Sequence, residues 1–168
     1  MKKLAEGYGK ACNCVNRILG FLIVLLFAAM FGSCILQVVT RYVLNNSLVW
    51  TDELARYTFI WGNMLGAAYC TWTFGHATLT VCLDRFPAGV RRILQILTYL
   101  LVAAIGCVLV VAGIRLMPVV AVQKSPALHL PMRYVYSSVL VGGVLFVLYS
   151  IGHILNFLGG EPAAKEEV

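Results

Sequence analysis

Residues 41–57 read RYVLNNSLVWTDELARY, and the rest of the chain is interpreted around them. The neighbouring stretches 18–40 and 58–83 contain no charged residue, whereas this one carries four: Arg41, Asp52, Glu53 and Arg56. It also contains Trp and Tyr, which favour the membrane–water interface because each joins an apolar ring to a polar group. We therefore predict a turn at a bilayer surface, followed by a membrane helix that begins at the acidic pair.

The composition indicates an integral membrane protein. Of the 168 residues, 61% are hydrophobic and 12% are charged, whereas soluble domains are about 25% charged. Apolar runs of about 18 residues or more are read as membrane spans. We predict an all-α integral membrane protein, a bundle of four tilted helices with short interfacial segments that forms a single domain over residues 1–168. The expected spans are about 18–40, 52–74, 88–114 and 133–158, with an extension of the third to 123 left open.

The orientation is predicted from the basic residues. Residues 1–17 hold four Lys or Arg and one acid, so they are expected to be a basic cytoplasmic N-terminus, and residues 159–168 a polar tail. With both termini inside, eight basic residues lie on the cytoplasmic side and five outside. Because loops rich in Lys and Arg stay in the cytoplasm, we predict an N-in, C-in arrangement with residues 41–56 and 125–132 in the periplasm.

The net charge of +6 does not indicate a nucleic-acid-binding protein, because the basic residues are scattered around apolar runs and form no stripe. They are better explained as topology signals and contacts to anionic lipid. Three of the six cysteines lie inside apolar runs, where Cys behaves as a small hydrophobic residue. We expect all six to be free thiols.

The acidic pair is interpreted as a helix cap and salt-bridge cluster, in preference to a catalytic or cation-binding pair. Acids are favourable in the first turn of a helix, where the helix dipole is positive. Asp52 and Arg56 are four residues apart and can pair along the helix surface. Arg41, at the end of the preceding span, is expected to form an ionic lock with Asp52 or Glu53, and the choice between the two acids stays open.

Two glycines of the second expected span are expected to mediate helix packing. Gly62 and Gly66 lie one turn apart in the second expected span, and small residues let membrane helices approach closely. Gly106 and Gly113 are seven residues apart and fall on one stripe of the third.

The stretch 41–57 resembles the small membrane subunit of tripartite ATP-independent periplasmic (TRAP) transporters, the DctQ family. In that family a membrane helix ends in Arg-Tyr, and a polar turn, a Trp, an acidic pair and a basic residue follow. The matching positions are Arg41, Tyr42, Trp50, Asp52, Glu53 and Arg56. A second similarity is the periplasmic turn before the last helix, with Ser125, Pro126 and Pro131, and a third is a cytoplasmic segment with His76 and Arg85.

The resemblance implies a non-enzymatic subunit of the bacterial inner membrane. Its partners would be the lipid bilayer, a large TRAP permease subunit that it scaffolds, and a periplasmic substrate-binding protein that it helps to dock. The transporter would take up organic acids or related solutes, driven by sodium. The sodium and substrate sites would lie in the large subunit, so no cofactor and no catalytic, metal or substrate-binding residue is assigned here.

Two alternatives stay open. One is a haem-bearing membrane anchor of a redox complex, which needs two axial His on different helices. His76 and His153 both fall toward the cytoplasmic side of the predicted topology, but His76 lies at a helix end. The other alternative is a membrane assembly factor, which co-purification would distinguish.

Overall fold

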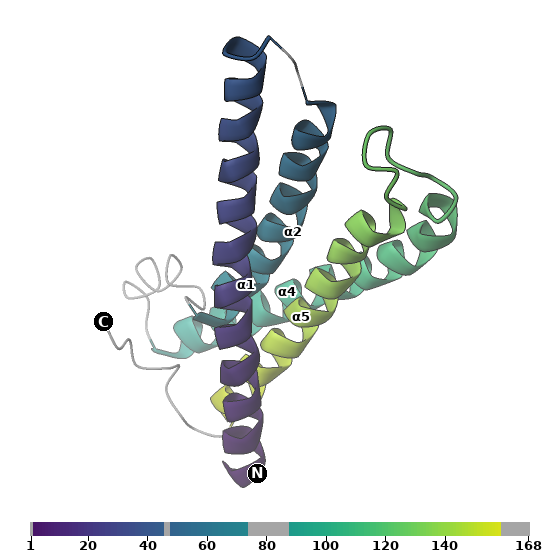
Figure 1. Ribbon diagram of the computed structural model, residues 1–168. Coiled ribbons are helices and arrows are strands. Elements are labelled where there is room, and N and C mark those ends of the chain that lie inside the picture. Colours follow the sequence, from purple (N-terminus) through teal and green to yellow (C-terminus); the bar gives the residue numbers. More distant parts are fainter. Residues whose placement is uncertain (1, 46–47, 74–87, 159–168) are drawn as a thin grey trace.

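The chain folds into helices, as predicted. The computed structural model describes residues 2–45, 48–73 and 88–158. Within these ranges the helices are α1 (Lys2–Tyr42), α2 (Val49–Thr73), α4 (Ala88–Val120) and α5 (Arg133–Leu158). Figure 1 shows α1 beside α2 and α4 beside α5, as two pairs inclined to one another. Helix α5 also packs against α2 and α1, and so joins the two pairs.

Three helices in the described part of the chain are long and apolar enough to cross a membrane. They are Gly7–Tyr42, Ile93–Val120 and Arg133–Leu155. Helix α2 is not among them, so the prediction of four spans stays a prediction. Its 25 residues correspond to about 38 Å at 1.5 Å per residue, which exceeds the roughly 30 Å of a hydrocarbon core.

Helix α1 is longer than the expected span of residues 18–40. It runs unbroken for 41 residues from Lys2 to Tyr42, so the expected basic flank at residues 1–17 continues the same helix. No proline interrupts this part of the chain, and Tyr8 and Cys12 on its first turns pack against the core. Tertiary contacts therefore support the helix beyond its most apolar segment.

Helix α4 passes through Pro118 and ends at Val120, so the helix continues beyond residue 114, while the extension of the membrane span stays a prediction. A proline near the end of a helix removes one backbone hydrogen bond, and neighbouring groups accommodate the loss in a membrane helix. The chain then makes a compact connection at residues 121–132 before α5 begins.

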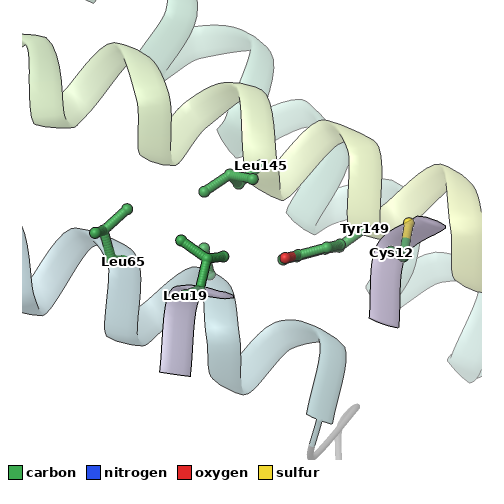
Figure 2. Packing of buried hydrophobic residues seen from close by; sticks show 6 residues of the cluster. Cys12, Leu19, Leu65, Leu145 and Tyr149 are labelled. Atoms are coloured by element: carbon green, nitrogen blue, oxygen red, sulfur yellow. The ribbon is translucent and has the colours of Figure 1, made fainter. Parts of the chain in front are cut away.

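The core lies where α1, α2 and α5 meet (Figure 2). Each helix contributes two buried residues, and together they are Cys12, Leu19, Leu65, Ala68, Leu145 and Tyr149. Tyr149 is 1% exposed and Ala68 is fully buried. Polar side chains at the same end of the bundle also join helices: Trp72 Nε1 donates to Asn13 Oδ1 at 2.6 Å, and Asn16 Nδ2 donates to Thr73 Oγ1 at 2.7 Å.

Helices α4 and α5 pack through glycine. A Cβ built on Gly106 would lie 2.9 Å from the Gly143 carbonyl oxygen, and one on Gly143 would lie 3.0 Å from the Gly106 carbonyl oxygen. The two backbones thus touch directly at this crossing. A Cβ built on Gly113 would lie 3.3 Å from Leu140, so Gly106 and Gly113, predicted to lie on one stripe, both contact α5.

Candidate functional site

The first turn of α2 places its two acids in different surroundings. Neighbouring residues of an α-helix point about 100° apart, so Asp52 and Glu53 cannot share a face. The Asp52 side chain is 52% exposed, whereas Glu53 as a residue is 7% exposed. Thr51, which is fully buried, donates its hydroxyl to the Leu48 carbonyl at 2.6 Å and closes the start of the helix.

Glu53 binds the connection between α4 and α5. The Ser125 hydroxyl donates to Glu53 Oε2 at 2.6 Å, and the backbone N–H groups of Ala127 and Leu128 donate to Oε1 and Oε2 at 3.0 Å each. We call these four residues the clasp. Hydrogen bonds to an ionised acceptor are stronger than those between neutral groups. One carboxylate therefore fastens a segment more than 70 residues away in sequence to the start of α2.

The clasped segment is itself a small hairpin, here called the turn, residues 124–132. An isolated β-bridge joins Lys124 to Pro131, and the Ser125 N–H donates to the Leu130 carbonyl at 2.9 Å. At its tip His129 has a φ of 51°, in the left-handed region that non-glycine residues seldom adopt. His129 and Leu130 are exposed, and Leu130 is 43% exposed despite its apolar side chain. The turn thus projects with both His129 and the apolar Leu130 exposed.

The surroundings of Glu53 favour its charged form. The carboxylate lies level with the turn, beyond the apolar segments of α4 and α5. The hydrogen bond from the Ser125 hydroxyl lowers the pKa of Glu53 most, burial opposes this shift, and the Leu128 and Ala127 amides and Arg56 lower it further. Because the net shift is downward, the clasp is fully formed at neutral pH and its contribution is lost as pH falls through the lowered pKa.

Of the two ion pairs predicted from the sequence, one forms and one does not. Asp52 and Arg56 pair at 2.9 Å, as their spacing predicted, with both side chains more than half exposed. The ionic lock with Arg41 is wrong: among the described residues neither acid forms an ion pair with it. Asp52 is engaged by its neighbour one turn along α2, and Glu53 points toward the turn instead, while Arg41 is exposed.

The remaining predicted residues are distributed around this end of the bundle. Tyr42 is 75% exposed at the end of α1 and Trp50 is 38% exposed at the start of α2, both on the surface. Pro126 is exposed in the turn and Pro131 is half-buried. One further link escaped the sequence analysis: Trp61 Nε1 donates to the Tyr134 carbonyl at 3.1 Å and ties α2 to the start of α5.

Of the two glycines predicted to mediate packing, Gly62 lies at a helix contact and Gly66 does not. A Cβ added to Gly62 would meet the Phe27 ring of α1 at 3.4 Å, an ordinary contact distance, so Gly62 does lie in a helix contact. One added to Gly66 would meet nothing within 4 Å. Gly66 therefore takes no part in packing within the described chain.

His76, one of the two histidines in the haem hypothesis, lies outside the described residues. Arg85 lies outside them too. His153 stacks on Tyr99 with ring centroids 4.9 Å apart, and its Nε2 lies 3.0 Å from the Thr71 carbonyl oxygen. Within residues 2–45, 48–73 and 88–158 there is no group of three His, Cys, Asp or Glu that could hold a metal ion.

Comparison with known proteins gives a consistent result. The sequence model of the family described as "Tripartite ATP-independent periplasmic transporters, DctQ component" matches residues 30–160. A TRAP transporter small permease protein of Haemophilus influenzae is 29% identical over 143 residues, which cover 84% of this chain and 88% of that protein. The sialic acid TRAP transporter small permease protein SiaQ of Vibrio cholerae is 28% identical over 145 residues, 86% of this chain and 83% of that one.

A longer protein is also similar. The sialic acid TRAP transporter permease protein SiaT of Haemophilus influenzae is 29% identical over 101 residues. They cover 60% of this chain but 16% of that protein. A segment similar to this chain therefore occurs there as part of a much larger permease polypeptide.

Proposed function

Since the chain belongs to the DctQ component family of tripartite ATP-independent periplasmic transporters, we propose that it scaffolds a large permease subunit and presents the turn to a periplasmic substrate-binding protein. The chain is the small permease subunit of a TRAP transporter and a multi-pass protein of the inner membrane. Its family consists of transporter membrane subunits and is not an enzyme family.

The observation that carries the proposal is the clasp. A connection between membrane helices needs only to join them, yet residues 124–132 are held by the Glu53 carboxylate, which accepts hydrogen bonds from two of their amides and one of their hydroxyls. Ordering this segment costs conformational entropy. Because the surface is already ordered before a partner arrives, the entropic cost of binding is lower. A docking role for the exposed tip accounts for this rigidity.

The solute class is proposed to be organic acids, taken up with sodium. Two relatives are named for sialic acid, which is itself an organic acid. The substrate and sodium sites are proposed to lie in the large subunit, as membership of the small-subunit family implies.

The docking role is tested at the tip of the turn. Leu130→Asp, at a site 43% exposed, should reduce substrate uptake by roughly tenfold, since a charge replaces an apolar contact at an interface. The yield of the complex with the large subunit should be unchanged, because Leu130 lies outside the core. Val144→Ala, on the outward surface of α5, is the control, and equal uptake in both variants would remove the docking role of the tip.

We further propose four spans with both termini in the cytoplasm, so that the turn faces the periplasm. In a background without native cysteines, His129→Cys should react with a membrane-impermeant thiol reagent added to intact cells. Ala164→Cys, in the polar tail outside the described residues, should react only after the cells are opened. Labelling of position 164 alone in intact cells would reverse the orientation.

A further inference from the structure

Helix α2 leaves one side uncovered. Its other sides pack against α1 and α5 (Figure 1). The uncovered side runs along most of the helix, and we call it the outer stripe: Asp52, Arg56, Phe59, Asn63, Gly66 and Cys70, all exposed except Gly66, which is half-buried with open space at its Cβ position. Successive members are separated by four, three, four, three and four positions. The average repeat is 3.6 residues, one turn of an α-helix, so the outer stripe runs along one side of α2, parallel to its axis.

Asn63 lies at the centre of the outer stripe, ten residues before the end of α2 at Thr73. Its side chain is exposed, and no other residue in the described ranges hydrogen-bonds to it. With α2 as one of the four proposed spans, a carboxamide facing lipid tails would have no hydrogen-bond partner, and polar side chains in membrane helices bond instead to neighbouring helices. Asn63 therefore needs a polar partner that none of the residues in the described ranges supplies.

On the uncovered side of α2, the residues that follow Asn63 have small side chains. A Cβ added to Gly66 would meet nothing within 4 Å, and Ala67 and Cys70 are exposed beside it. Small residues allow the backbone of a second helix to come close. The outward face of α4 has the opposite character, with large aliphatic residues suited to lipid: Ile93 is 68% exposed, Leu100 58% and Val108 67%.

We propose that the outer stripe is the contact surface for a membrane helix of the large permease subunit. That helix places a hydrogen-bonding group opposite Asn63 and bulky apolar side chains opposite Gly66. The large subunit is chosen over a second copy of this chain because, in the permease relative SiaT, a similar segment forms 16% of one longer polypeptide. Covalent attachment keeps the rest of such a permease beside the segment. This inference rests on the proposed scaffold function and specifies the surface that performs it.

The first test is photo-crosslinking of the complete complex in its own membranes. A photoreactive residue at Ala67, beside the outer stripe, is compared with one at Ala112, which is exposed on α4. The expected adduct joins this chain to the large subunit, at least about fivefold more from position 67 than from position 112, because side chains at helix contacts lie within reach of the partner. An adduct of two copies of this chain from position 67, or equal yields from both positions, would overturn the proposal.

The second test uses matched substitutions. Gly66→Leu and Asn63→Leu should each reduce the large subunit that co-purifies in mild detergent, by roughly tenfold for Gly66→Leu, whereas Ala112→Leu should leave it unchanged. Gly66→Leu should not lower the melting temperature of the isolated subunit, since a Cβ at this position meets nothing within 4 Å and leucine is favoured over glycine in a helix. Co-purification of Gly66→Leu at the control level would overturn the proposal.

Co-purification of the unmodified chain distinguishes an error in the contact surface from an error in the scaffold function. If the unmodified chain co-purifies with the large subunit but position 67 does not crosslink to it, the outer stripe is wrong and the scaffold function stands. If the unmodified chain does not co-purify with it at all, the scaffold function is wrong and the inference falls with it.

Discussion

Glu53→Gln should release the turn, lowering the melting temperature of the isolated subunit by several degrees and substrate uptake by roughly tenfold, as expected when buried donors lose a charged acceptor. The amide is similar in shape to the carboxylate, so packing at the site is retained. One of the two acceptor oxygens becomes an –NH₂ donor, which faces the amide of Ala127 or the donors of Ser125 and Leu128. Donor then meets donor, and the turn loses part of its attachment to α2.

The adjacent acid provides the control. Asp52→Asn removes the same charge from the same helical turn, but the pair that it breaks with Arg56 is more than half exposed on both sides. Such pairs contribute about 0–1 kcal/mol, so melting temperature and uptake should stay close to the wild-type values. Arg41→Gln should also behave as wild type, because Arg41 is paired with neither acid. If Asp52→Asn and Glu53→Gln have equal effects, the net charge of this surface matters and the clasp does not.

Gly106→Ala should destabilise the packing of α4 on α5 by about 1–3 kcal/mol, the usual cost of overfilling a close-packed site. The new methyl group would lie 2.9 Å from the Gly143 carbonyl oxygen and 2.8 Å from Val147 Cγ2. The valine can rotate, but the carbonyl belongs to the backbone of α5 and can move only with its helix. Thermal unfolding in mild detergent, followed by intrinsic fluorescence, measures the effect.

Gly32→Ala is the matched control, because a Cβ at Gly32 meets nothing within 4 Å. Alanine is favoured over glycine in a helix by about 1 kcal/mol, so this variant should be as stable as the wild type or slightly more so. Equal stability of the two variants would show that the backbones at the Gly106 crossing have room to separate.

Much of the helical framework follows from residue type alone. Uncharged apolar runs as long as a bilayer is thick form helices because no other structure satisfies the backbone hydrogen bonds there. The pairing of Asp52 with Arg56 was predictable for a similar reason, since both residues lie on one helix at a known spacing. In the same way, the charge-rich stretch from Arg41 to Arg56 correctly placed the end of α1 and the start of α2 to within a few residues.

Contacts between helices were less predictable. Gly62 and Gly66 were chosen for their spacing, but spacing does not tell which side of α2 the other helices cover, and Gly66 is left uncovered. The closest backbone contact instead joins Gly106 to Gly143, on different helices. It depends on where α4 and α5 cross, which many side chains determine together.

The sequence by itself determined the helices, the exposed ion pair and the family, because each depends on local spacing or on residue patterns that relatives share. The tertiary structure alone decided the partner of Glu53. Arg41 has the opposite charge and lies nearer in sequence, which made it the expected partner. The bundle, however, brings Ser125 and the amides of Ala127 and Leu128 to the carboxylate. A buried carboxylate is stabilised by whichever donors the fold places within about 3 Å, and neither charge nor sequence separation reveals which those are.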